Sequence, residues 1–146
     1  MLKFKSSLIA LVLLMSAITS CSKSDDTPAA QANPIEGKWQ FSKEGTFTNN
    51  QEALVDYQHT PGCTKDYIEL LSGNVLKEHY FENNGTTNCQ EIIDVASWSR
   101  NNNTLTFVIP NEPTLNSEIL DLTPTTLKIK FTLGTTSRST VFTRIN

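Results

Sequence analysis

The feature that most constrains the fold of this 146-residue chain is a regular succession of short β-forming runs after residue 38. Clusters of glycine, asparagine, proline and threonine bound the runs, as they do where strands end in turns. No segment shows the apolar period of an amphipathic helix. The sequence therefore predicts an all-β domain whose eight strands cover residues 39–48, 65–72, 75–82, 89–99, 104–109, 117–122, 126–133 and 139–145.

The run at 126–133 shows the clearest alternation, with an apolar residue at every second position and Lys128 and Lys130 between them. This pattern predicts one buried and one solvated face. Short connections such as residues 72–74 favour antiparallel neighbours. We expect an eight-stranded antiparallel up-and-down β-barrel, since closure removes exposed strand edges. A flat sandwich of the same strands is the alternative.

The first predicted strand opens with Gly37-Lys38-Trp39, and Arg144 lies near the end of the last. These features resemble the lipocalins, in which the tryptophan of a G-x-W motif plugs the closed end of an eight-stranded barrel and an arginine of the last strand packs over its ring. Seven chain reversals place both ends of the run of strands at the same end of the barrel. The resemblance implies that Gly37, Trp39 and Arg144 form the barrel floor. A guanidinium over an indole contributes about 0.5–2 kcal/mol.

The resemblance covers residues 34–146 and is strongest to short lipocalin-like lipoproteins of the Bacteroidetes. It implies a barrel domain at 35–146 that holds a small ligand at its open end. We do not expect a helix after the strand at 139–145, such as larger lipocalins have. The barrel is therefore expected to be small, with an interior that is either a reduced cavity or filled by side chains.

Residues 1–20 have the layout of a secretory signal peptide, with Lys3 and Lys5 ahead of an apolar core at 8–15. That core is shorter than the roughly 20 residues of a membrane-spanning helix. The sequence ITSC, which ends at Cys21, resembles the lipobox of bacterial lipoproteins, in which the cysteine is lipidated and begins the mature chain. Acyl chains such as palmitate on Cys21 would anchor the protein stably to a membrane.

An acidic segment, SKSDD at residues 22–26, follows the cysteine. It resembles the export signal of Bacteroidetes surface lipoproteins; a solvated linker is the alternative. Residues 21–34 are expected to be the lipidated cysteine and a flexible tether, because they are small, polar and proline-bearing. We therefore expect an outer membrane lipoprotein, on the outer leaflet in preference to the periplasmic one.

Charge and cysteine content bound the partners. Removing residues 1–20 takes away two lysines, so ten basic and fifteen acidic residues leave a net charge of −5. Without a basic patch, nucleic acid is not expected as a partner. Cys63 and Cys89 are expected to form a disulfide worth about 3–4 kcal/mol, two free thiols being the alternative. His59 and His79 follow no metal-ligand spacing, so neither a metal nor a cofactor is predicted.

The loop at 49–64 is the longest connection and falls at the open end, where Cys63 and Cys89 would also lie. It would serve either as a lid pinned to the rim or only as an irregular loop held down by the disulfide. Large apolar side chains near the barrel mouth are candidates for the ligand wall, although most of them would serve equally as core. These candidates are Phe41, Leu54, Tyr57, Tyr80, Trp98, Phe107 and Phe131.

No catalytic constellation is evident, and none of the known nucleophile or phosphate-binding motifs occurs. The sequence favours a lipid-anchored binding protein for a small, apolar ligand. One alternative is a filled barrel that binds a protein partner, as inhibitor-like lipoproteins do. An enzyme is not expected, because it would need a titratable pair inside the barrel, such as an inward-facing His79 beside a carboxylate.

Overall fold

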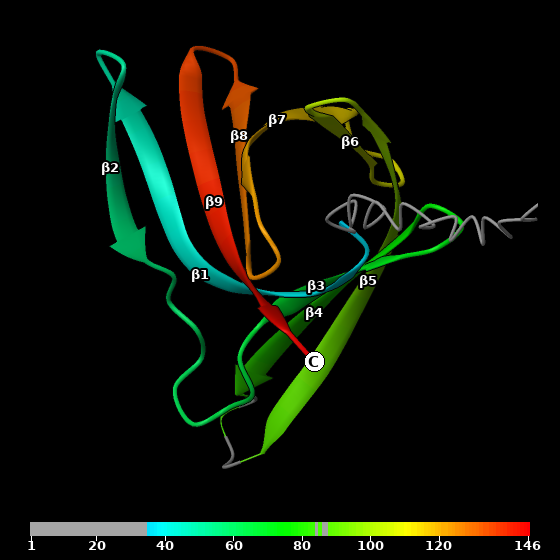
Figure 1. Ribbon diagram of the computed structural model, residues 1–146. Helices are drawn as coiled ribbons and strands as arrows, with labels where there is room; N and C mark the ends of the chain where they lie inside the picture. The colour runs from blue at the N-terminus through cyan, green and yellow to red at the C-terminus, as the bar shows by residue number, and fades with distance from the viewer. Residues whose placement is uncertain (1–34, 84, 86–87) are drawn as a thin grey trace, which may run out of the picture. The chain divides into compact units, whose positions relative to one another are not determined.

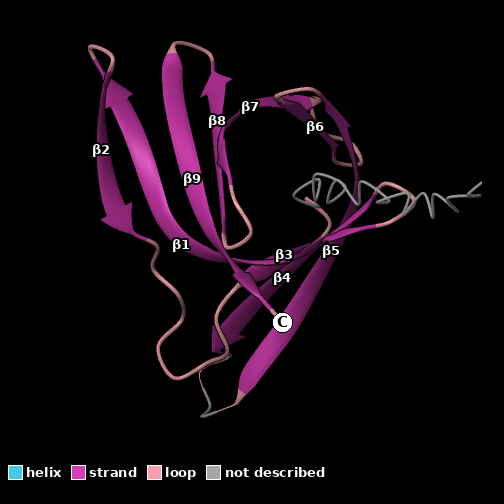
Figure 2. Cartoon of the chain, in the orientation of Figure 1, coloured by secondary structure: helices cyan, strands magenta, loops and turns pink. Residues whose placement is uncertain are grey.

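The structure is a computed structural model that describes residues 35–83, 85 and 88–146. The predicted signal peptide (1–20), and the tether with Cys21 (21–34), lie outside the described residues. Every regular element in the described part is a β-strand (Figure 2). A search of the same residues finds no helix with the length and apolarity needed to cross a membrane.

All eight predicted strands are present within a few residues of their predicted bounds, and one further strand joins them. The described residues thus form nine strands of one antiparallel sheet. The strands are β1 (Gly37–Thr48), β2 (Gln51–Asp56), β3 (Tyr67–Leu71), β4 (Val75–Asn83), β5 (Cys89–Asn101), β6 (Thr104–Val108), β7 (Leu115–Leu122), β8 (Thr126–Leu133) and β9 (Thr136–Ile145).

The sheet closes on itself because β1 pairs with both β3 and β9. Trp39 of β1 faces Ile68 of β3 on one side and Arg144 of β9 on the other. The strands β1 and β3 to β9 therefore form a closed, eight-stranded, antiparallel up-and-down barrel (Figure 1). This confirms the predicted fold class, and the pairing of β1 with β9 excludes the flat sandwich.

The prediction of a loop over residues 49–64 is wrong in its first half, because β2 pairs with the C-terminal half of β1. Asn49 and Asn50 form the turn between them with φ of 51° and 61°. Asparagine enters this left-handed region more readily than most residues, and hairpin turns require it. The sequence of β2, QEALVD, does not alternate between apolar and polar residues, so its period gave no strand signal.

A carboxylate bridge holds β2 against the outside of the barrel. Glu52 of β2 accepts hydrogen bonds from Lys128 Nζ of β8 and from Ser139 Oγ of β9, both at 2.5 Å. Both hydrogen bonds lower the pKa of Glu52, and the one from Lys128 has the larger effect. Gly45 of β1 lies under the bridge, and a Cβ there would collide with Ser139 Oγ. Lys128 thus lies on the outer face, as the alternation predicts.

The closed end is built around Trp39, which is fully buried. The guanidinium carbon of Arg144 lies 4.0 Å from the centre of the indole ring, so the predicted stacking contact is present. Arg144 also donates hydrogen bonds to the carbonyls of Pro124 (2.8 Å) and Glu36 (2.9 Å). Gly37 has a φ of 134°, and a Cβ at this position would collide with the guanidinium. The glycine is therefore required by both backbone conformation and space.

The hydrophobic core fills the barrel from this closed end. Its fully buried members are Trp39, Leu70, Leu105 and Leu127, and each lies close to a closed-end turn or to Gly37. The other buried apolar residues of the same cluster are Ile35, Ile68, Leu76, Trp98, Phe107, Ile119, Ile129 and Phe142. Side chains thus pack the floor of the barrel solidly.

The predicted disulfide between Cys63 and Cys89 is confirmed, with a Cα–Cα distance of 5.5 Å. It ties the connection at residues 57–66 to the first residue of β5. Since β5 begins at the open end, the bridge fastens this connection to the barrel rim.

Replacing Arg144 with alanine tests the barrel floor. The change removes the stacking contact and leaves two carbonyls without a donor, so the free energy of unfolding should fall by about 2 kcal/mol. Urea denaturation measures the difference. Arg138→Ala, an exposed arginine on the same strand, is the control and should change stability by less than about 0.5 kcal/mol. Equal losses in the two variants would contradict the assignment.

Candidate functional site

The strand register decides which side chains of β4 and β5 point into the barrel. Leu76 belongs to the buried core, and Glu78 and Tyr80 lie on the same face of β4 because side chains alternate along a strand. His79 therefore points outward. Glu78 faces Asp94 of β5 across the sheet, so Asp94 shares the inward face.

A cavity of about 190 Å³ lies inside the barrel, and we call it the barrel cavity. Three of the predicted ligand-wall residues, Phe41, Phe107 and Phe131, line it. The rest of its wall is formed by Ile68, Leu76, Glu78, Leu115, Ile129, Thr140 and Phe142. This wall is mainly apolar, and an apolar cavity of roughly 150 Å³ is large enough to take up a benzene molecule.

A second cavity of about 150 Å³ shares Leu76 and Glu78 with the first, and we call it the rim cavity. Tyr80, another predicted ligand-wall residue, lines it together with Asp94 and Glu112. Asp94 is exposed to solvent. The two cavities therefore run from an apolar interior to an acidic, solvated rim, and Glu78 stands where they meet.

The carboxyl group of Glu78 is held in an unfavourable setting. Burial raises its pKa, and so do the nearby carboxylates of Asp94 and Asp66, while a hydrogen bond with Tyr80 acts in the opposite direction. Burial, followed by the bond to Glu78, also raises the pKa of the Tyr80 phenol. Glu78 and Asp94 form a titratable pair on the inward face of the barrel, which only the strand register reveals and no pattern in the sequence indicates.

The connection at 57–66 completes the barrel wall between β1 and β3. The ring of Tyr57 stacks on Phe41 at 4.7 Å between centroids. The backbone N–H of Asp66 donates to His59 Nδ1 (3.0 Å), so Nε2 carries the proton that is donated to the carbonyl of Phe41 (3.0 Å). Burial and then Asp66 raise the pKa of Tyr57. Tyr57 is thus a wall residue behind Phe41.

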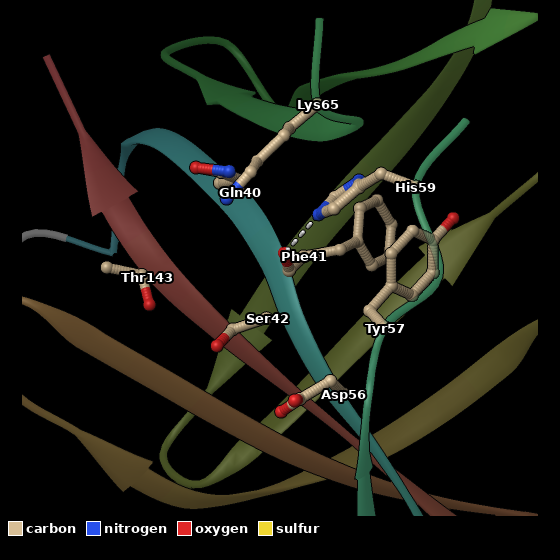
Figure 3. A pocket seen from close by; sticks show the side chains of 8 residues that line it. All are labelled: Gln40, Phe41, Ser42, Asp56, Tyr57, His59, Lys65 and Thr143. Carbon is tan, nitrogen blue, oxygen red and sulfur yellow. Dashed lines mark hydrogen bonds between the residues drawn. The ribbon is translucent and has the colours of Figure 1, made fainter. Parts of the chain in front are cut away.

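A polar groove of about 450 Å³ lies on the other side of the stacked rings of Phe41 and Tyr57. Figure 3 shows these rings side by side, with the hydrogen bond from His59 to the carbonyl of Phe41. The groove is otherwise lined by Gln40, Ser42, Asp56, Lys65 and Thr143. Phe41 borders both spaces, so its ring helps to separate the apolar interior from the polar exterior.

Comparison with protein families decides the affiliation. The model of the lipocalin-like domain family matches residues 35–129, which is more than half of the chain. The chain belongs to the lipocalin-like domain family. This assignment agrees with the closed barrel, the arginine over the floor tryptophan and the interior cavity.

Two solved structures resemble the lipocalin-like barrel at low sequence identity. A dog lipocalin allergen shares 14% identity and a TM-score of 0.41, over 77% of this chain and 76% of the allergen. A deswapped triple mutant of bovine odorant binding protein shares 16% identity and a TM-score of 0.40, over 75% of this chain and 73% of its own. No curated protein sequence matches the chain significantly.

Three predicted ligand-wall residues, Leu54, Tyr57 and Trp98, lie outside both cavities of the lipocalin-like barrel, and Tyr57 lines the polar groove instead. Leu54 is on the outward face of β2, beside Gly45, and is 43% exposed. A loop at residues 49–64 folded over the mouth would bring Leu54 into the wall, but β2 instead pairs with β1 as its neighbour in the sheet. Trp98 is a core residue whose indole N–H donates to the carbonyl of Leu71 (3.1 Å).

His79 lies in a separate cluster on the outer face of the lipocalin-like barrel. Its ring stacks on Tyr67 at 4.2 Å, its Nδ1 contacts Glu91 at 2.8 Å, and its Nε2 lies 3.4 Å from Glu69. It is therefore not the inward-facing histidine that an enzyme was expected to need. In the part of the chain that the structure describes, no group of three or more histidine, cysteine or acidic side chains is placed to hold a metal ion.

The pKa of Glu78 predicts a pH-dependent stability. Because the folded state raises this pKa, the folded protein holds the proton more tightly than the unfolded chain does. The stabilisation is complete below the unfolded pKa of about 4.3 and is lost as pH rises through the folded value. Glu78→Gln should therefore match the wild type at pH 4 and have the larger free energy of unfolding at pH 7.

Urea denaturation at several pH values measures this difference between variant and wild type. Glu82→Gln is the matched control, because Glu82 is an exposed residue near the end of the same strand. Parallel stability profiles for Glu78→Gln and the wild type would show that Glu78 is not protonated more readily in the folded state.

Proposed function

We propose that this protein is a binding protein that holds a small, largely apolar molecule inside its barrel. The observation that carries the proposal is the barrel cavity, with Phe41, Phe107 and Phe131 in its wall. Its volume suits a ligand about the size of one aromatic ring. Burial of the ligand's apolar surface would supply most of the binding free energy, at about 25 cal/mol per Å².

We propose that residues 57–66 control access to this cavity. Tyr57 stacks on the ring of Phe41, and the disulfide at Cys63 fastens the same connection to β5. Rotation of the stacked pair would open a path from the polar groove to the interior. The disulfide limits how far the connection moves while this happens.

We also propose that the protein binds its ligand without catalysing a reaction on it. Glu78 and Asp94 form a titratable pair, and the hydroxyl group nearest to Glu78 along the inward face is that of Tyr80. The raised pKa of Tyr80 makes its phenol a poor nucleophile at neutral pH. A pair of carboxyl groups beside an unreactive phenol is suited to holding a polar group of a ligand.

A variant that fills the cavity tests the binding function. Thr140 lines the barrel cavity, whereas Thr143 on the same strand lines the outer groove. Isothermal titration with indole should show binding to the wild-type chain in phosphatidylcholine nanodiscs. Thr140→Phe should weaken this binding at least tenfold, and the control Thr143→Phe less than twofold. The reverse order would move the site to the outer groove.

Membrane attachment is the second part of the proposal. The signal peptide pattern, the ITSC motif ending at Cys21 and the acidic segment behind it favour a lipidated protein of the outer membrane, exposed on the outer leaflet. Several acyl chains on one cysteine give stable anchoring, whereas one chain is marginal. The tether would then let the barrel stand clear of the bilayer.

Cys21→Ala tests the anchor. Cells that express the wild type and are fed radioactive palmitate should yield a labelled protein in the outer membrane fraction. The variant should carry no label and leave the membrane fraction, since its lipid attachment site is gone. Protease treatment of intact cells reports the leaflet. An unlabelled wild type, or a labelled variant, would rule out lipidation at Cys21.

A protein partner is the second candidate function. Three β-branched side chains on β5 and β6, Ile93, Val95 and Val108, are 46–56% exposed. Such side chains favour contact with an apolar surface of another protein. Binding of a partner that survives Thr140→Phe but not Ile93→Asp, a change at a residue that lines neither cavity, would support this function over ligand storage.

A further inference from the structure

All charged side chains that line the two cavities are acidic. Glu78 lines both cavities, and Asp94 and Glu112 line the rim cavity. Among the residues that the structure describes, no lysine, arginine or histidine lines either space. Arg138, on the inward face of β9 beside Phe131, is exposed and borders neither cavity.

The carboxyl groups around Glu78 converge from several elements. Asp94 is its direct partner on β5, and Asp66, which precedes β3, acts on it through space. On β4 itself, the Tyr80 hydroxyl forms a hydrogen bond with Glu78. Asp66 is held by the backbone N–H of Phe81 (2.9 Å) and lies 3.6 Å from His59, whereas no described cationic side chain lines the cavities beside Glu78 and Asp94.

A cation beside Glu78 would reduce two unfavourable contributions, the burial of its charge and the repulsion from Asp94. It would neutralise a carboxylate that is largely removed from water, and it would screen Glu78 from Asp94. Charge-assisted hydrogen bonds are about twice as strong as neutral ones. An anionic ligand would instead meet the like charges of Glu78, Asp94 and Glu112, and a neutral carbonyl would find no charged donor, only the hydroxyls of Tyr80 and Thr140 and a protonated Glu78.

Resting on the proposed function, we infer that the ligand is a small amphipathic amine. Its protonated amino group binds between Glu78 and Asp94, with the Tyr80 hydroxyl as a further acceptor. Its apolar body occupies the barrel cavity against Phe41, Phe107 and neighbouring apolar side chains. Because the two cavities meet at Glu78, the amino group can lie at the rim cavity while the apolar body lies in the barrel cavity.

Three compounds with similar bodies and different head groups test this inference: 2-phenylethylamine, 2-phenylethanol and 3-phenylpropanoic acid. Isothermal titration uses the full chain in phosphatidylcholine nanodiscs, with empty nanodiscs as the blank. At pH 7 the amine should bind at least tenfold more tightly than the alcohol, because a hydrogen bond to a charged group is the stronger one. The acid should bind more weakly than the alcohol.

Substitution of the carboxyl group separates charge from shape. In Glu78→Gln the amine should lose its advantage and bind within about twofold of the alcohol, while the alcohol keeps its wild-type affinity. Glu82→Gln, the exposed control on the same strand, should leave all three affinities unchanged. Asp94→Asn should reduce the advantage of the amine partially.

The pH dependence gives an independent readout. A proton on Glu78 competes with the amine, so the affinity for the amine should rise between pH 5 and pH 7.5, whereas the affinity for the alcohol should not rise. If the alcohol binds as tightly as the amine throughout, the inference is wrong and the binding function stands. If none of the three compounds binds above the blank, both fail.

Discussion

The double pairing of β1 is the constraint on which the rest of the structure depends. Its first residues pair with β3 and β9 at once, which turns a row of strands into a closed wall. Closure satisfies the backbone hydrogen-bonding groups of both edges and gives the sheet an inside. Trp39 lies on this seam, and Arg144 covers it from the neighbouring strand. A barrel without this seam would have neither a floor nor a cavity.

The same strand also joins two different environments. Before the irregularity between Phe41 and Lys43, β1 pairs with β3; after it, β1 pairs with β2 instead. Its pairing with β9 continues on the other side. The space that β3 leaves is filled by residues 57–66, with Tyr57 behind Phe41. The Glu52 bridge holds β2 to β8 and β9, and the disulfide holds residues 57–66 to β5. The disulfide lies on residues 57–66, which are proposed to control access to the cavity, and the Glu52 bridge lies on β2, the strand that leads into them.

The barrel interior contains one partly buried carboxyl group, that of Glu78, although the rest of the core is apolar. Apolar side chains fill the floor, yet Glu78 is placed among them above the core, where desolvation raises its pKa. Burying a carboxyl group opposes folding unless it gains partners, and here it gains one hydroxyl and a neighbour of like charge. Local departures of this kind are expected where a protein binds something. The position of Glu78 is therefore the main support for the proposed ligand chemistry, more than the phenylalanine side chains around it.

Local patterns in the sequence account for much of this architecture. Alternation and turn residues predicted eight strands, and a count of chain reversals brought Trp39 to Arg144 and Cys63 to Cys89. Phe41, Phe107 and Phe131 line the barrel cavity, and their role in holding a ligand stays a prediction. β2 was missed for want of alternation, and Leu54 was misplaced with it.

The sequence by itself determined eight of the nine described strands and the disulfide, and its resemblance to the lipocalins, with the parity of reversals, determined the closed end. Only the tertiary structure decided the register between β4 and β5, and with it the inward position of Glu78 and Asp94 and the outward position of His79. The physical reason is the two-residue period of a strand, since a shift of one residue turns every side chain to the other face. Long-range pairing sets that shift, and no local pattern in β4 or β5 records it.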